Sequence, residues 1–276
     1  MSFRPRKRFG QHWLRSELAL SKIVAAAELS QKDHLLEIGP GTGILTRRLL
    51  PQAASVVAVE IDRDLCQQLS KSLGKVENFL LLSGDILNLS LEDCLQAFPH
   101  FRPINKVVAN IPYNITGPIL EKLLGTIAQP RQPSYDSIVL LMQKEVAERL
   151  VAQPGTKLYG GLSVRVQYLA RCEWIAEVPK KAFQPPPQVD SAILRLSPYT
   201  LTSPAHNPRF LEQLVKLGFA NRRKMLRNNL KSLLDGDRLM PILKDLQIEA
   251  QVRAEELSLS QWIDLSNQLE SLLKTP

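Results

Sequence analysis

Short apolar runs alternate with segments of helical spacing through the first half of the chain. Five runs rich in Val, Ile and Leu each have the length of one buried strand: 35–38, 56–61, 79–82, 107–109 and 138–142. Between them, apolar residues recur every three or four positions, as in an amphipathic helix, over segments such as 44–50, 65–73 and 119–127. Alternating strands and helices predict right-handed crossovers and a mainly parallel, doubly wound α/β sheet.

The pattern changes in the second half. Two further extended runs, 162–177 and 191–196, are joined by the proline-rich F-Q-P-P-P-Q-V-D and predict an antiparallel edge, for seven strands in all. The alternative is that 162–171 begins in a helix. After the breaker-rich T-L-T-S-P-A-H-N-P, apolar residues keep helical spacing. We therefore expect a large α/β domain over 1–200 and a small α-helical domain over 201–276.

The composition is that of a folded protein without special anchors. The 276 residues, 44% of them hydrophobic, suffice for one large core and a smaller one. No run of eighteen apolar residues occurs, and the basic N-terminus lacks the apolar segment of a signal peptide, so we expect a cytoplasmic protein with no membrane contact. Three scattered cysteines are expected to stay reduced, and four histidines without ligand spacing argue against a metal site.

The charge balance favours a polyanionic partner. The formal net charge is +8, and Lys and Arg that neutralise phosphates release counterions on binding. One basic group lies near the N-terminus and consists of Arg4, Arg6, Lys7 and Arg8. A second lies in the predicted helical domain, where no acidic residue occurs between 216 and 231. Two solvated faces would give the same pattern, so charge alone does not identify the partner.

The segment L-L-E-I-G-P-G-T-G-I-L-T, at 35–46, indicates a strand that turns sharply into a helix. Glycines such as Gly39 and Gly41 let a ligand approach the backbone, and the N–H groups at the start of a helix attract an anion. A tight turn without a ligand would contain the same glycines. The spacing G-x-G-x-G differs from the dinucleotide pattern G-x-G-x-x-G, which disfavours a nicotinamide oxidoreductase.

Two acidic residues follow the next two strands. Glu60 ends V-V-A-V-E, where a carboxylate can accept both hydroxyls of a ribose, and Asp85 follows the strand after it, where it can accept an adenine amino group. Together with the glycine turn, they predict a site for an adenosine that carries an amino-acid tail, namely S-adenosylmethionine. Asp62 is a rival for the ribose, but side-chain alternation favours Glu60 and leaves Asp62 as a helix cap.

The motif N-I-P-Y directly follows the fourth apolar run. The Asn110 side-chain oxygen and the Ile111 carbonyl could accept both N–H groups of an adenine amine and favour the pyramidal geometry that attacks a sulfonium methyl. Tyr113 could stack on a base drawn out of RNA and stabilise the developing positive charge, while Pro112 fixes the angle between them. The alternative is a strand-ending turn with a core Tyr and a capping Asn.

These motifs together resemble the small-subunit ribosomal RNA adenine dimethyltransferases. The resemblance runs from Phe9 to about Leu230 and is carried by R-K-R-F-G-Q-H-W-L, E-I-G-P-G-T-G, V-E-I-D, G-D-I-L, N-I-P-Y-N-I-T, Y-G-G-L-S-V-R-V-Q-Y, F-Q-P-P-P-Q-V-D-S-A and F-A-N-R-R-K-M-L-R-N-N-L. It implies a Rossmann-like S-adenosylmethionine-dependent methyltransferase fold for 1–200 and dimethylation of N6 of two adjacent adenosines in the 3′-terminal hairpin of 16S rRNA. It also implies a monomer that acts on the assembling 30S subunit and serves as a late assembly checkpoint.

The resemblance also assigns residues. Its cofactor site comprises His12, Leu14, Gly39, Gly41, Glu60, Ile61, Asp85, Ile86 and Asn110. Phe183 is expected to close over the flipped adenine opposite Tyr113, with core packing as the alternative. The common form of the first motif has Asn and Phe where this chain has His12 and Trp13, a change that a backbone contact to the cofactor would survive.

The basic run in the helical domain is expected to grip RNA phosphates, through the shape of rRNA helices more than their sequence, with Arg222, Arg223, Lys224 and Arg227. Two related functions share part of the pattern. Resistance methyltransferases of the large subunit share N-I-P-Y and the glycine turn, although L-S-V-R-V-Q-Y and R-R-K-M-L-R-N-N-L fit the small-subunit branch better. Noncatalytic RNA-binding or transcription-factor relatives are disfavoured by the intact cofactor and N-I-P-Y motifs.

Overall fold

The computed structural model describes residue 6 and residues 10–274. The chain forms two compact units. Unit 1 is built from the chain up to Leu123 together with 133–147 and 172–198, and unit 2 from 124–132, 148–171 and 199 onward. The chain passes from unit 1 to unit 2 for the last time after residue 198, two residues before the predicted domain boundary. Because two earlier segments also pack within unit 2, division into 1–200 and 201–276 stays a prediction.

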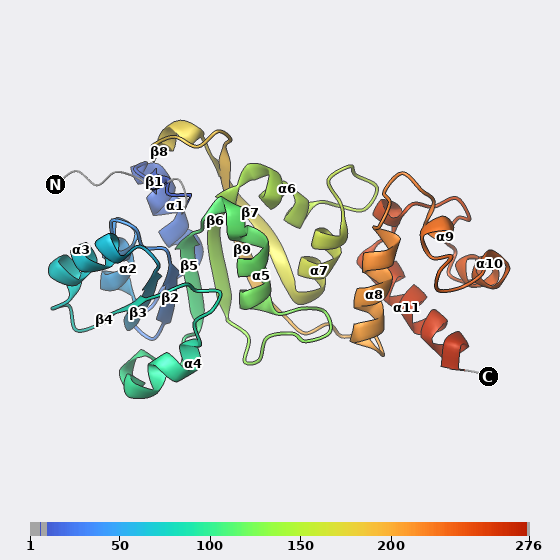
Figure 1. Cartoon of the computed structure of the whole chain (residues 1–276), viewed down its shortest axis with the longest axis horizontal. Helices are drawn as coiled ribbons and strands as arrows, with labels where there is room; N and C mark the ends of the chain where they lie inside the picture. The colour runs from blue at the N-terminus through green and yellow to red at the C-terminus, as the bar shows by residue number, and fades with distance from the viewer. Residues whose placement is uncertain (1–5, 7–9, 275–276) are drawn as a thin grey trace. The chain divides into compact units, whose positions relative to one another are not determined.

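Unit 1 contains a seven-stranded sheet of order β4-β3-β2-β5-β6-β9-β7, whose strands are labelled in Figure 1. Its strands are β2 (His34–Ile38), β3 (Ser55–Glu60), β4 (Phe79–Ser83), β5 (Lys106–Asn110), β6 (Ser137–Gln143), β7 (Ala170–Val178) and β9 (Ser191–Pro198). The first five pair in parallel, and β9 runs antiparallel to β6. The mainly parallel sheet with an antiparallel edge, predicted from the apolar runs, is confirmed.

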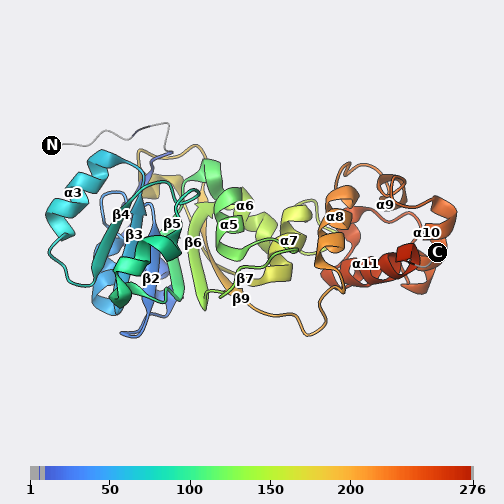
Figure 2. The ribbon, with the colours of Figure 1, turned by 60° about the horizontal axis from the view of Figure 1, so that its bottom comes forward.

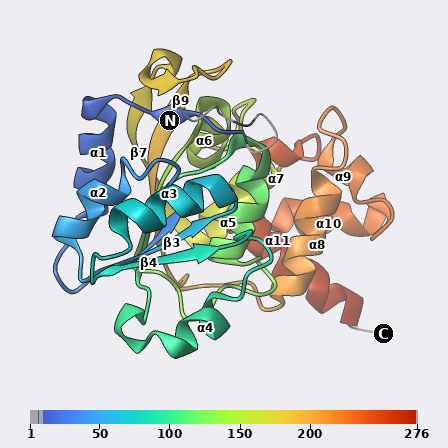
Figure 3. The same ribbon diagram turned by 60° about the vertical axis from the view of Figure 1, so that its left-hand side comes forward.

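Both faces of this sheet are buried. Val108, Val139 and Ile193 belong to one hydrophobic cluster, in which they are packed together with residues of the first three helices. Their neighbours along the strands, such as Leu140 and Leu194, point to the opposite face and are also fully buried. Figure 3 shows α1 and α2 on one side of the sheet and α5 on the other. This two-sided burial explains why the strands read as unbroken apolar runs.

The first six helices are α1 (Glu17–Ala27), α2 (Thr46–Leu49), α3 (Arg63–Leu73), α4 (Leu91–Cys94), α5 (Thr116–Leu124) and α6 (Lys144–Val151). The helix predicted over 44–50 is shorter than expected, because it begins at Thr46 and passes into the 3₁₀ turn η2 (Leu50–Gln52). Other 3₁₀ turns are η3 (Leu95–Ala97), η4 (Pro99–Phe101), η5 (Tyr113–Ile115), η6 (Lys180–Ala182) and η7 (Ala254–Glu256).

A second, two-stranded sheet joins the N-terminal segment to the proline-rich segment. In it, β1 (Trp13–Leu14) pairs antiparallel with β8 (Phe183–Gln184), so that Leu14 lies opposite Phe183. This pairing brings two motifs that are far apart in the sequence to the same edge of unit 1.

Unit 2 is helical. It contains α7 (Gly161–Leu169), α8 (Pro208–Gly218), α9 (Leu226–Asn229), α10 (Gly236–Asp245) and α11 (Leu259–Lys274), the last four of which are gathered in Figure 2. The prediction of an extended run over 162–177 is wrong for its first part, since α7 occupies 161–169; the alternative of a helical start is confirmed. The buried Trp262 of α11 packs on Phe219, with 5.7 Å between ring centroids. No described helix is long and apolar enough to cross a bilayer.

The end of α8 approaches α11 so closely that only glycine fits there. A Cβ atom on Gly218 would lie 2.4 Å from Cη2 of Trp262 and 3.2 Å from a methyl carbon of Leu226. We therefore predict that Gly218→Ala lowers the free energy of unfolding by roughly 1–3 kcal/mol, because the indole must shift. Thermal melting measures this. Gly236→Ala at the start of α10, where no atom lies within 4 Å, is the control; equal melting temperatures of the two variants would contradict the prediction.

Candidate active site

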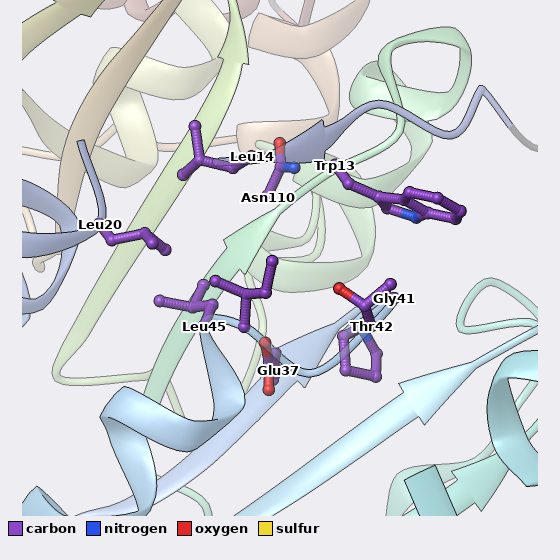
Figure 4. Close-up of a pocket in the computed structure, with 11 residues that line it drawn as sticks. Trp13, Leu14, Leu20, Glu37, Gly41, Thr42, Leu45 and Asn110 are labelled. Carbon is purple, nitrogen blue, oxygen red and sulfur yellow. The ribbon is translucent and has the colours of Figure 1, made fainter. Parts of the chain in front are cut away.

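The glycine turn borders a small cavity at the carboxyl end of β2. Gly39 and Gly41 have φ of +68° and +59°, a backbone region that favours glycine. A Cβ on Gly41 would also lie 3.3 Å from a ring carbon of Trp13. The cavity, about 40 Å³ in volume, is lined by the turn together with Trp13, Leu14 and Asn110, as Figure 4 shows. Three segments distant in sequence therefore meet around the turn.

Glu60 fastens the glycine turn to the end of β3. One of its carboxylate oxygens accepts the Gly41 N–H at 3.0 Å, and the other accepts the Asp62 N–H at 2.9 Å. Burial raises the pKa of Glu60, and these two N–H groups oppose that shift. Both oxygens are thus in use, and a ribose hydroxyl at Glu60 would have to share or replace the contact with Gly41.

Asp62 has a structural role that the sequence predicts. Its side chain caps α3 by accepting the Asp64 N–H at 3.1 Å. Asp62 also accepts hydrogen bonds from Arg6 at 3.1 Å and from Gln11 at 2.9 Å, which tie the N-terminal segment to the sheet. The helix cap expected for Asp62 is confirmed. Glu60 and Asp62 both accept hydrogen bonds within the protein, so the preference for Glu60 as the ribose ligand stays a prediction.

The residues after β3 and β4 lie outside the small cavity. Asp85 accepts hydrogen bonds from the Leu87 N–H and the Asn88 side chain, at 3.0 and 2.9 Å, so it already shapes its own turn. Ile86 is buried, whereas Ile61 is 44% exposed. An exposed Ile61 is available to a flat apolar ligand.

The two polar groups of N-I-P-Y are held in place by different neighbours. Asn110 ends β5 and donates its amide N–H to the His12 carbonyl at 3.2 Å, so the amide oxygen is the atom that can accept a ligand's proton. The Ile111 N–H donates to the Leu141 carbonyl of β6 at 3.1 Å. Pro112, with φ −61° and ψ 131°, leads into η5, which begins at Tyr113. The motif therefore forms a rigid corner.

Tyr113 lines a second and larger cavity. Its hydroxyl is hydrogen-bonded to Ser191 of β9, and its ring is stacked on His12. Burial raises the pKa of Tyr113, against a smaller opposite effect of the Ser191 bond. The cavity, about 710 Å³ in volume, is bounded by 10–12, Gln143 and 184–189. Its volume is in the range of pockets that accept a small organic ligand such as a base.

Phe183 does not line this cavity. The ring is 4% exposed and belongs to the hydrophobic cluster of unit 1, with Leu14 opposite it across β1 and β8. A stacking ring must present a face to its ligand, so this placement favours the core-packing alternative. A role of Phe183 in closing over adenine stays a prediction.

In unit 2, the predicted RNA-binding residues differ in what they contact. Arg222 donates to the carbonyls of Lys157 and Tyr159, at 2.8 and 2.7 Å, and so fastens the loop before α7. Arg223 and Lys224 are exposed, and Arg227 of α9 is half-buried. Of the N-terminal basic group, Arg4, Lys7 and Arg8 lie outside the described residues, as does Phe9 of the first motif.

Glu37 is a site residue that the sequence reasoning missed. It lines the small cavity from β2, is 1% exposed, and has one carboxyl oxygen with no hydrogen-bond partner. Burial raises the pKa of Glu37 to about 8, so the carboxyl is mainly protonated at neutral pH. The available signal was a single acid inside the apolar run L-L-E-I. No group of three His, Cys, Asp or Glu among the described residues could hold a metal ion.

Solved structures place this fold among Rossmann-like methyltransferases. A dimethyladenosine transferase from Plasmodium falciparum is similar with a TM-score of 0.79 and 26% identity, over 94% of this chain and 98% of that one. The 23S rRNA methyltransferase ErmE is similar with a TM-score of 0.71 and 26% identity, over 94% and 99%. The chain is thus a methyltransferase by fold.

The family follows from the sequence comparisons. The family described as Ribosomal RNA adenine dimethylase matches residues 2–271, and the chain belongs to it. A relative named Ribosomal RNA small subunit methyltransferase A from Rippkaea orientalis is 68% identical over 97% of this chain and 98% of its own length. One of the same name from Synechocystis sp. is 60% identical, over 99% of both chains. The resemblance drawn from the motifs is confirmed.

The buried Glu37 predicts an unusual dependence of stability on pH. Between its ordinary pKa of 4.5 and about 8, the folded state keeps a proton that the unfolded state has lost, so stability declines as pH rises through this window. Glu37→Gln removes that decline. We predict that the melting temperature of the variant, relative to that of the unmodified chain, increases as the pH is raised from 5 to 9. The total increase should correspond to roughly a few kcal/mol in the free energy of unfolding.

The control for this experiment is Glu17→Gln, on an exposed side chain of α1. A melting-temperature difference between Glu37→Gln and the unmodified chain that stays constant from pH 5 to pH 9 would show that Glu37 is not a buried neutral acid.

Proposed function

We propose that this chain transfers methyl groups from S-adenosylmethionine to N6 of two adjacent adenosines in the 3′-terminal hairpin of 16S rRNA, giving N6,N6-dimethyladenosines. The observation that carries the proposal is the position of N-I-P-Y between two cavities. Asn110 borders the small cavity beside the glycine turn, and Tyr113, three residues later, lines the larger one. A motif so placed can bring a base held on one side to a methyl donor held on the other.

The cofactor proposal rests on how the residues around the glycine turn match its chemical groups. S-adenosylmethionine supplies an electrophilic methyl group on a sulfonium when it is bound. We assign its ammonium group to Glu37, whose unpartnered buried oxygen calls for a donor, and its carboxylate to the N–H groups of the turn. Glu60 would accept the ribose hydroxyls and Asp85 the adenine amino group, with Ile61 and Ile86 on either side of the ring.

The small cavity would take only the amino-acid end of this ligand, because Glu60, Ile61, Asp85 and Ile86 do not line it. The contact that holds the turn in place is the Gly41 N–H on Glu60. We infer that the ribose hydroxyls take over this oxygen, so that Glu60 exchanges a backbone donor for a ligand donor and keeps the same number of hydrogen bonds.

The chemistry at the base follows from the orientation of N-I-P-Y. With its amide nitrogen on the His12 carbonyl, Asn110 offers its oxygen to one N–H of the adenine amine, and the Ile111 carbonyl accepts the other. Both acceptors favour the pyramidal amine, whose lone pair would form the new N–C bond as the methyl C–S bond of the sulfonium breaks and S-adenosylhomocysteine leaves. The methylated amine would then be cationic and acidic enough to lose its extra proton to water, so no strong base is needed. Tyr113, fixed by Ser191, provides a stacking face. The buried Phe183 would join only if its ring became exposed.

The small-subunit substrate is favoured over the large-subunit one by the relatives. The protein named Ribosomal RNA small subunit methyltransferase A from Rippkaea orientalis is 68% identical, whereas the 23S rRNA methyltransferase ErmE is 26% identical. We propose that the substrate is the assembling 30S subunit, that the enzyme acts in the cytoplasm as a monomer, and that it has a role in late assembly.

We predict that labelled-methyl transfer to small subunits lacking the modification yields N6,N6-dimethyladenosine, identified as the product nucleoside. Asn110→Ala should lower the transfer rate by roughly 100-fold or more, since it removes an acceptor used in the transition state, while affinity for the subunit stays near normal. Isolated large-subunit rRNA is the matched control substrate. Methylation of that RNA but not of small subunits would assign the chain to the other branch, and near-normal activity of Asn110→Ala would remove the role given to Asn110.

The basic residues of unit 2 should separate into two classes. The double variant Arg223→Ala with Lys224→Ala should bind small subunits more weakly. The slope of log binding constant against log salt concentration should become shallower by up to about one for each phosphate that is no longer neutralised. Arg222→Ala should instead destabilise the loop before α7, because Arg222 holds the Lys157 and Tyr159 carbonyls. Binding titrations at several salt concentrations, together with melting curves, distinguish them. Unchanged affinity of the double variant would exclude this surface as the RNA grip.

A further inference from the structure

His12 contacts both functional ends of N-I-P-Y. Its backbone carbonyl accepts the Asn110 amide N–H at 3.2 Å. Its imidazole ring is stacked on the Tyr113 ring, with 5.8 Å between centroids and 21° between planes. One residue from the N-terminal segment thus orients the group that would hold the adenine amine and also packs against the ring that would stack on the base.

The imidazole is itself fixed by the proline-rich segment. Its Nδ1 atom lies 2.9 Å from the Pro185 carbonyl oxygen. Because a carbonyl only accepts, Nδ1 carries the proton and donates it, which defines the tautomer and the plane of the ring. The adjacent pairing of Trp13 with Gln184 holds the two backbones in register. His12 therefore cannot turn away from Tyr113 without breaking this hydrogen bond.

These contacts leave Tyr113 little freedom. Ser191 holds its hydroxyl, and the His12 ring lies nearly parallel to the Tyr113 ring in an offset stack that restrains the plane of Tyr113. Both His12 and Tyr113 line the 710 Å³ cavity. A stacking ring that is fixed before the base arrives avoids the entropy cost of ordering it during the reaction.

We propose that the His12 side chain is a positioning residue of the base pocket. Its ring fixes the plane of Tyr113 for stacking, in addition to any backbone contact between this segment and the cofactor. The proposal rests on the proposed function of N-I-P-Y. It accounts for a departure from the common motif, since Asn at this position would keep the carbonyl that holds Asn110 but would lack the ring that packs on Tyr113.

Two substitutions separate the contacts of His12. His12→Asn keeps the backbone carbonyl and removes the aromatic ring, whereas His12→Phe keeps a ring over Tyr113 and removes the N–H that donates to Pro185. The matched control is His34→Asn. His34 is also half-buried in unit 1, but it begins β2, at the opposite end of the strand from the glycine turn, and its Nδ1 atom lies 2.7 Å from Ser55 Oγ.

The experiment measures single-turnover methyl transfer to small subunits, S-adenosylmethionine affinity and melting temperature for the three variants and the unmodified chain. We expect His12→Asn to slow transfer roughly 2- to 10-fold, the worth of an aromatic pair, with cofactor affinity unchanged. His12→Phe should restore most of the rate, and His34→Asn should transfer at the normal rate.

The possible failures are distinguishable. If the unmodified chain methylates small subunits and His12→Asn matches it, the inference is wrong while the proposed function stands. If His12→Phe is as slow as His12→Asn, or if cofactor affinity falls in parallel with the rate, the ring over Tyr113 is not what matters. If the unmodified chain does not methylate small subunits, the proposed function itself fails.

Discussion

The hydrogen bond from the Gly41 N–H to the Glu60 carboxylate connects the ends of β2 and β3, and the rest of the site is built outward from it. The other Glu60 oxygen accepts the Asp62 N–H, and the Asp62 side chain in turn accepts the Gln11 amide. His12 comes next in the chain and reaches N-I-P-Y. The glycine turn and N-I-P-Y are therefore linked through one series of contacts, although they are far apart in the sequence.

The two buried carboxyl groups of this site, those of Glu60 and Glu37, have different electrostatic surroundings. Glu60 is buried but receives two backbone N–H groups, which stabilise its charge and oppose the effect of burial. Glu37 is also buried and lacks a partner for one oxygen, so burial dominates and favours its neutral form. A cationic ligand group beside Glu37 would supply the missing partner and favour ionisation. A ligand would therefore add a missing hydrogen-bond partner at Glu37 but not at Glu60. This difference cannot be recognised from the sequence alone.

Much of the fold could be predicted from the sequence because its information is local. Strands buried on both faces must be apolar throughout, and the runs at 107–109 and 138–142 mark β5 and β6 closely. The extended prediction failed at α7, where Val, Leu and Tyr residues suit either element and packing decides. Asp62 could be recognised as a cap from its position after a strand, because a cap acts on its own helix.

The site was less predictable, because its contacts join residues far apart in the sequence. Phe183 illustrates this. Its sequence motif predicts a ring that stacks on the base, but Phe183 lies opposite Leu14 in the pairing of β1 with β8 and packs in the hydrophobic cluster. The stacking of His12 on Tyr113 and the position of Glu37 beside the small cavity likewise depend on the tertiary fold. Family membership supplied the identity of the motifs, and the structure supplied which side chain touches which.

The pairing of β1 with β8 has a consequence for the time at which the site is completed during synthesis. His12 is synthesised before its partner Pro185, which follows 173 positions later, and Ser191, which holds Tyr113, follows after that. The parallel strands β2 to β5 can pair earlier, since translation proceeds from the N-terminus. The half of the site around the glycine turn is thus complete in sequence well before the pocket around Tyr113, and a chain released before β9 would lack the walls of that pocket.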